Sequence, residues 1–509
     1  MKKLERLLRL SPPMILFFAL FGVYLATIAP GLTWANDGSD GGDLITAAAT
    51  GGIAHPTGYP LFILLARLFQ FLPIGSLAFR TNLMSALAAA IAALIVYKIV
   101  AKSLSSIPIP MKALAGLSAG FAFGLAPLIW SQAVITEVYT LHVMFMGLLL
   151  FLSVFVSTDQ NKHKRLDLLV GAIFGLAMGN HITTIFILPV ILLTTIRVKP
   201  NQGSKIIWKQ YIHLNGRALF QRLIGIGLGL LVYIILPLRA NTHPPVNWGN
   251  PSSLGGFIWL VTGKLYQGLI LDLNIPFIMQ RAQTAIALLL EQFGIIGLCI
   301  GFIGLILFFK PNSLNISMLW IVFISFTFAI GYGTSDAYLY LIPAFLCFAV
   351  WIGVGLGSLM VSLSRHSNYI GYLLGLIITV IFLIQGWSAW SHVDASHDQR
   401  AETFGKSVLS IAPTDAIVFA KGDEAVFSLW YFQYALQERT DLAIISTDLL
   451  QYGWYLYTLQ NTYPKLNLPG SYLFKESVIT ANPRRSVCYV QYEKVAEINC
   501  LPAGQPQIP

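Results

Sequence analysis

The sequence is poor in charged residues. Only 11% of its 509 residues are Asp, Glu, Lys or Arg, whereas 56% are hydrophobic, and the mean hydropathy is +0.70. A soluble protein of this length needs more charged side chains to cover its surface, so the composition excludes an ordinary soluble protein. We therefore expect a polytopic membrane protein, with the lipid bilayer as its surroundings.

Cysteines are also few, and their spacing matches no metal site. Cys299 and Cys347 lie in apolar runs, and Cys488 and Cys500 lie in the polar tail. If the tail faces an oxidising compartment, Cys488 and Cys500 can form a disulfide, and a pair of free buried thiols is the alternative.

The net charge of +10 would suggest nucleic acid as the partner of a soluble protein. Here the basic residues lie mostly in short loops between apolar spans, where they set the orientation of the chain. We therefore expect no nucleic-acid partner.

Eleven apolar segments are predicted to cross the membrane. They cover about residues 12–29, 77–101, 112–130, 136–157, 166–180, 182–197, 220–238, 287–309, 314–332, 336–360 and 368–388. The apolar segment 59–72 is shorter and bounded by prolines, which favours a re-entrant or interfacial helix. No A-x-A-like cleavage site follows the first segment, so it is expected to be a retained helix rather than a signal peptide.

Basic clusters predict the orientation. With the N-terminus in the cytoplasm, the clusters at 98–112, 162–165, 197–222, Lys310 and Arg365 all fall on the cytoplasmic side. The loop 31–60 and the C-terminus are then external. We expect a multi-pass protein of a bacterial plasma membrane.

Acidic residues gather on the other face. Ten acidic residues precede residue 390, and seven of them lie at or near the outer ends of the spans: Asp37, Asp40, Asp43, Glu137, Asp272, Glu291 and Asp336. The remaining three are Glu5, Asp159 and Asp167. Carboxylates contribute little to topology, so this gathering favours a site on the outer face.

The tail has a different composition from about residue 391. Charges return, spans stop, and the runs 416–420, 443–446 and 487–492 are typical of strands. We predict two units: a transmembrane domain over 1–390 and an external soluble α/β domain over 391–509.

The stretch from Asp40 to Pro60 is the strongest candidate site. It carries Asp40, Asp43 and His55 and no Lys or Arg. Asp40 could simply cap a helix over 44–50, as acidic residues in a first turn often do. The glycines between the two aspartates would let backbone approach a ligand closely, which favours binding.

Other candidates are spread along the chain. Glu137 lies near the end of a span, where a carboxylate costs free energy unless it is paired or functional; a first-turn Glu at the interface is the alternative. His181 follows Asn180, and its imidazole could merely satisfy backbone carbonyls. Arg239 lies on the outer side, which suggests an anionic partner, although snorkelling to lipid phosphate explains it as well. Trp248, in a loop rich in aromatic residues, could belong to an interfacial belt.

The motifs resemble a known family. D-G-G-D-L-I, G-I-A-H-P-T-G-Y-P-L, W-S-Q-A-V-I-T-E-V-Y-T-L-H, G-N-H, and L-P-L-R-A with N-W-G-N-P are similar to a family of polytopic membrane proteins related to protein O-mannosyltransferases. The resemblance covers roughly residues 13–270. It implies the GT-C glycosyltransferase fold, with an essential acidic residue in the first external loop and a sugar carried by polyprenyl phosphate. The family's usual acidic pair is Asp then Glu, whereas the second position here is Asp43.

The resemblance implies an inverting hexosyltransferase that moves a sugar, such as mannose, to a hydroxyl of a protein or glycan acceptor. Asp40 would be the base and Asp43 its partner or a metal or acceptor contact; a divalent metal is left open and no other cofactor is expected. His55, His181 and Arg239 are candidates for the phosphate, and Glu137 for orienting sugar or acceptor. The remaining predicted substrate-binding residues are Tyr59, Tyr139, Asn180, Asn247 and Trp248. A transporter or flippase of lipid-linked glycans, or a glycan ligase or polymerase, is the alternative.

Overall fold

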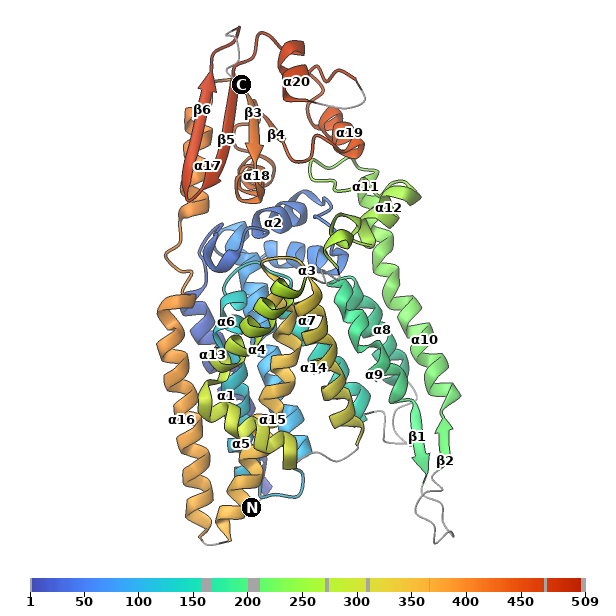
Figure 1. Cartoon of the computed structure of the whole chain (residues 1–509), viewed down its shortest axis with the longest axis vertical. Helices are drawn as coiled ribbons and strands as arrows, with labels where there is room; N and C mark the ends of the chain where they lie inside the picture. The colour runs from blue at the N-terminus through green and yellow to red at the C-terminus, as the bar shows by residue number, and fades with distance from the viewer. Residues whose placement is uncertain are drawn as a thin grey trace.

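A computed structural model describes residues 2–156, 166–199, 211–270, 274–307, 312–365, 367–470 and 474–504. A bundle of helices carries a small α/β domain at one end (Figure 1). Several residues used in the charge argument lie outside the described residues: Asp159, the cluster at 162–165, part of the segment 197–222, Asp272 and Lys310.

Each of the eleven predicted spans contains a helix. The bundle consists of α1 (Lys2–Thr27), α4 (Leu77–Ser103), α5 (Ile109–Gly124), α6 (Pro127–Ala133), α7 (Tyr139–Phe151), α8 (Leu166–Met178), α9 (Leu188–Leu193), α10 (Gly216–Leu230), α11 (Ile235–Ala240), α13 (Ile275–Leu307), α14 (Ser313–Gly331), α15 (Ile342–Ser364) and α16 (Asn368–Val393). The sixth predicted span runs too far, because α9 ends at Leu193 and a strand begins at Ile196.

Length and apolarity single out six spanning helices among the described residues, or seven when α5 and α6, bent by 67° at their junction, count as one. Four shorter apolar helices coincide with the other predicted spans. The fifth short helix is α3 (Pro60–Gln70), which the sequence predicted not to cross. The chain is therefore a multi-pass membrane protein.

Burial differs between the helices in the way a membrane bundle requires. The span that contains α15 has 94% of its most apolar window buried, whereas the span formed by α10 and α11 has only 22% buried. A helix that is apolar all round has to face protein or lipid on every side, so α15 lies inside the bundle and α10 presents leucines and isoleucines outward.

Two short helices lie between the bundle and the α/β domain (Figure 1). These are α2 (Gly41–Thr50) and α3, joined by the loop that contains His55. Proline at the first position of α3 suits a helix start, since its missing N–H would be unsatisfied there. The predicted external loop is therefore a structured layer.

The C-terminal unit contains a four-stranded sheet in the order β4-β3-β5-β6. Its strands are β3 (Ile417–Lys421), β4 (Ala443–Ser446), β5 (Val487–Glu493) and β6 (Val495–Leu501), and its helices are α17 (Arg400–Ile411), α18 (Asp423–Trp430), α19 (Gly453–Thr462) and α20 (Lys475–Ala481). β3 pairs in parallel with β4 and β5, and β6 pairs antiparallel with β5. The three predicted strands are confirmed, and β6 was missed. Cys488 and Cys500, directly opposite each other on β5 and β6, form a disulfide.

A second, two-stranded hairpin lies at the other end of the molecule (Figure 1). It pairs β1 (Ile196–Lys199) with β2 (Tyr211–Leu214). The α/β domain and this hairpin therefore mark opposite ends of the bundle, and α2 belongs to the domain end.

Candidate active site

Asp40 precedes the first residue of α2, but its side chain does not cap the helix. Its backbone carbonyl accepts a hydrogen bond from the N–H of Leu44 at 3.1 Å, while the carboxylate makes no capping bond. The capping interpretation of Asp40 is therefore not supported, and the carboxylate is available for another role.

Asp43 lies one turn further along α2 and is fully buried. Its Oδ2 accepts hydrogen bonds from the backbone N–H of His55 at 2.9 Å and from the Nδ1 of the same residue at 2.8 Å. Its Oδ1 accepts a bond from Nε1 of Trp248 at 3.1 Å. A buried carboxylate requires such donors, because removing its hydration shell would otherwise cost several kcal/mol.

His55 connects the two aspartates. Its Nε2 lies 3.4 Å from Oδ2 of Asp40, an ion-pair distance. The side chain of Asp40 is 38% exposed and has no hydrogen-bond partner among the described residues. Burial by itself lowers the pKa of His55, but the charge of Asp40 and the hydrogen bond that His55 donates to Asp43 outweigh it and raise the pKa to about 9. His55 is therefore an imidazolium at neutral pH, held between two carboxylates.

Further carboxylates face this cluster, among them Glu137 and Asp336. The charge of Glu137 helps to raise the pKa of His55. Burial raises the pKa of Asp40, the charge of His55 opposes that rise, and the charges of Asp43 and Asp336 add to it. Asp336 precedes the short helix η6 (Ala337–Leu341) and was a weak signal in the sequence. Negative charge thus gathers around Asp40, a partly exposed carboxylate.

His181 lies beside the cluster within a group of aromatic rings. Its Nδ1 accepts the backbone N–H of Thr183, so a neutral imidazole carries its proton on Nε2. Nε2 has no hydrogen-bond partner in the described part of the chain. The ring centroid lies 6.1 Å from that of Tyr59 and 5.7 Å from those of Tyr139 and Tyr340.

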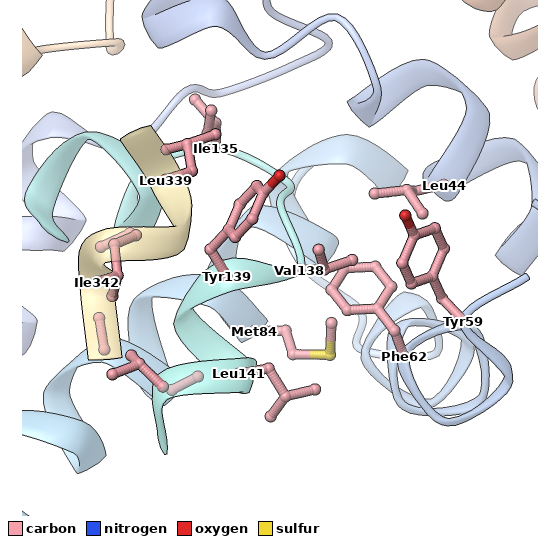
Figure 2. Close-up of a cluster of buried hydrophobic side chains, with 14 of the residues drawn as sticks. Leu44, Tyr59, Phe62, Met84, Ile135, Val138, Tyr139, Leu141, Leu339 and Ile342 are labelled. Carbon is pink, nitrogen blue, oxygen red and sulfur yellow. The ribbon is translucent and has the colours of Figure 1, made fainter. Parts of the chain in front are cut away.

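The rings of Tyr59 and Tyr139 pack against buried apolar side chains. Figure 2 shows both hydroxyl groups pointing away from Met84 and Leu141, which lie beneath them among other buried apolar side chains. This packing fixes the two rings, so both hydroxyl groups lie on the side away from Met84 and Leu141.

The loop after α11, which contains Val246 and Trp248, packs against the residues of the site. Ile53 donates its N–H to the carbonyl of Val246 at 2.9 Å and accepts the N–H of Trp248 at 3.3 Å, which fixes the indole against Asp43. Asn247 is buried in the same loop, and its amide oxygen has no partner among the described residues. The amide oxygen of Asn180 also has no partner among the described residues, while its amide nitrogen donates to the carbonyl of Val138.

Arg239 is not brought to the acidic cluster. Its guanidinium lies against Gly51, at the C-terminal end of α2, together with that of Arg67 from α3. Ten helical residues separate the two ends of α2, which is about 15 Å. The two arginines line a pocket whose other walls are mostly apolar, from α3 and α11: Ile63, Leu64, Ile235 and Leu236.

Sequence reasoning missed three residues near the site. Arg67 lies in the segment 59–72, which was predicted to be a re-entrant or interfacial helix that starts at the external loop. A basic residue on that side is as unexpected as Arg239, and this signal could have identified it. Asp423 and Phe427 come from α18, in a tail with no motif to identify them. Burial and the charge of Asp40 raise the pKa of Asp423 to about 6, so the C-terminal domain reaches the cluster.

The described residues include no group of three or more His, Cys, Asp or Glu side chains arranged to hold a metal ion. Both oxygens of Asp43 already accept hydrogen bonds from protein groups. The metal contact considered for Asp43 therefore competes with its bonds to His55 and Trp248.

Two family models match the chain. Residues 40–204 match the "Protein O-mannosyl-transferase TMEM260 N-terminal domain", and residues 401–498 match "TMEM260-associated domain 2". The first begins at Asp40 and the second covers α18 and most of the sheet.

Two curated relatives are similar over most of this chain. Protein O-mannosyl-transferase TMEM260 of mouse is 26% identical over 487 residues, which cover 89% of this chain and 65% of the mouse protein. The protein of that name from Dictyostelium discoideum is 26% identical over 506 residues, which cover 90% of this chain and 60% of the Dictyostelium protein. The chain thus spans less than two thirds of either relative. Both are eukaryotic, so they lend no support to a bacterial plasma membrane.

Solved structures share the fold. ArnT from Cupriavidus metallidurans, crystallised with undecaprenyl phosphate, aligns with a TM-score of 0.55 at 11% identity, over 94% of this chain and 92% of ArnT. The Archaeoglobus fulgidus oligosaccharyltransferase tethered to an acceptor peptide aligns with a TM-score of 0.50 at 11% identity, over 91% of this chain and 69% of the oligosaccharyltransferase. The domain matches and the relatives thus show that this chain is similar to the protein O-mannosyl-transferases named TMEM260 over most of its length, and the solved structures show that it shares the GT-C fold.

Proposed function

We propose that the chain is a membrane glycosyltransferase that moves a sugar, mannose, from a polyprenyl-phosphate carrier to a hydroxyl of a protein acceptor. The observation that carries this proposal is Asp40, a partly exposed carboxylate held beside the buried His55–Asp43 pair. The relatives named protein O-mannosyl-transferases support the sugar and the acceptor. The neighbour crystallised with undecaprenyl phosphate supports the donor lipid.

Asp40 is the general base. It takes the proton of the acceptor hydroxyl as the hydroxyl oxygen attacks the anomeric carbon of the sugar. The bond between that carbon and the phosphate oxygen breaks, and the polyprenyl phosphate leaves with the bonding electrons, which inverts the anomeric carbon. A raised pKa suits this role, because a base works best when its pKa is near the operating pH.

His55 positions this base. Both of its ring nitrogens face carboxylates, so binding the phosphate would mean giving up one of these contacts. The buried bonds of Asp43 hold the imidazole, and the imidazolium charge keeps Asp40 ionised and oriented. This role differs from the phosphate contact expected from the family resemblance.

The donor lies on the side of His181. Its Nε2–H is a donor that matches sugar and phosphate oxygens. The hydroxyl of Tyr139 lies beside it, whereas that of Tyr59 donates to the carbonyl of Pro56 at 3.2 Å and is therefore an acceptor toward a ligand. The buried amide oxygens of Asn180 and Asn247 are unpaired acceptors that match sugar hydroxyls. Glu137 faces the same cluster and orients the sugar or the acceptor. Arg239, at the far end of α2, is too distant to touch the leaving phosphate while Asp40 holds the acceptor.

The reaction takes place on the outer face. The site lies at the domain end of the bundle (Figure 1), and the disulfide in this domain is the kind that forms in an oxidising compartment. Nucleotide sugars stay in the cytoplasm, so a donor used outside has to cross the membrane, as a lipid-linked sugar can. Transporters usually gather polar groups near the bilayer midplane, whereas α2 lies at one end of this bundle.

Replacement of Asp40 by Asn tests this function. The variant keeps the size of the side chain but removes the base, so we expect turnover with purified polyprenyl-phosphate mannose to fall about 10²- to 10⁴-fold. Donor binding should change little. Asp37→Asn, in the same external loop, is the matched control and should remain active.

If the Asp40→Asn protein transfers sugar at a rate near that of the wild type, Asp40 is not the general base. If Asp43→Asn also folds and stays active, the transferase proposal fails, and transport of the lipid-linked sugar becomes the better explanation. Counting radiolabelled sugar on the acceptor against radiolabelled lipid moved across vesicles separates the two functions.

A further inference from the structure

The C-terminal domain touches the catalytic helix backbone to backbone. A Cβ added at Gly42 of α2 would lie 2.6 Å from the carbonyl oxygen of Phe427 in α18, closer than any side chain tolerates. A Cβ at the neighbouring Gly41 would meet Thr136 at an ordinary 3.6 Å. Gly42 is therefore the position that only glycine can fill while α18 stays in place.

This contact places an aromatic ring over the imidazole of His55. The Phe427 ring is nearly parallel to it, at 13°, with centroids 6.4 Å apart. Trp248 and Tyr59 approach the same imidazole edge-on, at 6.3 Å and 5.0 Å. At this distance the Phe427 ring limits the positions that the imidazole can adopt, and so favours one orientation of His55.

We infer that α18 is a wall of the catalytic centre and that Phe427 is a positioning residue, acting on Asp40 through His55. This inference rests on the proposed function and deepens it, because it makes the C-terminal domain part of the chemistry. Asp423, at the start of the same helix, is close enough to Asp40 for the two charges to interact. Gly42, the second glycine of the Gly41-Gly42 pair, thus allows the C-terminal domain to pack against α2.

The test compares Phe427→Leu with Phe427→Ala in the full-length protein. Leucine keeps apolar bulk but has no flat face, so it should restore folding without restoring catalysis. We expect kcat to fall about tenfold or more in both variants, with the KM for the lipid donor unchanged, because small misplacements of a catalytic group are costly. Phe419→Leu makes the same replacement inside the sheet of the domain and should keep wild-type kcat.

A second readout does not depend on activity. The rate at which diethyl pyrocarbonate modifies His55, measured by mass spectrometry, should rise when Phe427 is shortened and stay low in Phe419→Leu. Gly42→Ala should also raise this rate and lower kcat, because the added Cβ displaces α18.

The inference is overturned if Phe427→Leu keeps wild-type kcat and His55 labelling. An inactive wild-type protein would refute the proposed transferase, whereas the labelling rates would still decide whether Phe427 shields His55.

Discussion

The two ends of α2 carry opposite charges and are built differently. Asp40 and Asp43 lie at the N-terminal end, and the guanidinium groups of Arg67 and Arg239 lie at the C-terminal end. This arrangement suits the helix dipole, which is positive at the start of a helix and negative at its end. The dipole therefore favours each sign of charge where it is, but by only about 0.3–1 kcal/mol for each charge.

The hydrogen bonds distinguish the two ends. Asp43 accepts three bonds from protein donors in a fully buried position, which fixes one geometry for His55. Arg67 donates to the carbonyl of Ala48, and its guanidinium and that of Arg239 lie beside a mostly apolar pocket. The geometry of the acidic end suits the proposed base, whereas the cations at the other end satisfy the C-terminus of the helix.

The largest expected effect is that of Asp43→Asn. The change removes one charge of a buried pair and leaves two ring or indole donors without a carboxylate, which typically costs about 3–5 kcal/mol. We expect a clearly lower Tm in detergent by scanning fluorimetry. Asp43→Glu keeps the charge and should recover part of the stability; an unchanged Tm in Asp43→Asn would show that the buried network is not needed for folding.

The second effect is a pH dependence of stability that comes from His55. Its pKa in the folded protein, about 9, is above the ordinary value of 6.5. The extra stability is therefore fully present below about pH 6.5 and is lost as the pH rises through 9. Tm should fall across this window in the wild-type protein. A His55→Gln protein should be less stable at neutral pH and should show a flatter profile; equal slopes would mean that His55 does not titrate as expected.

The smallest expected effect is that of Arg239→Gln. A cation at a helix C-terminus contributes about 0.3–1 kcal/mol, so Tm should change little. The KM for the lipid donor should rise a few-fold at most, with kcat unchanged, and Arg67→Gln is the matched comparison. A hundredfold loss of kcat would place the leaving phosphate at this end and would break the contrast between the two ends of α2.

Much of the fold could be predicted because hydropathy is a local property. The apolar runs predict helices wherever about 20 residues avoid charge, and each of the eleven contains one. Three strands of the tail followed from short β-branched runs. β6 was missed because Val495–Leu501 mixes charged and apolar residues at an exposed edge.

Within the site, the sequence by itself determined that acidic residues, a histidine and tyrosines gather at one end of the membrane helices. It assigned the base to Asp40 only through the family resemblance, because Asp40 and Asp43 share a motif and a helix turn. The difference between the two comes from donors 12 and 205 residues away, at His55 and Trp248, which surround one carboxylate and leave the other open.

Only the tertiary structure separated Arg239 from the acidic cluster and brought Phe427 over His55. The first depends on the length and direction of α2, and the second on a contact between residues of opposite ends of the chain. Charge and hydropathy along a sequence set which residues avoid lipid, but the role of a polar group depends on which partners packing places within a few ångströms of it.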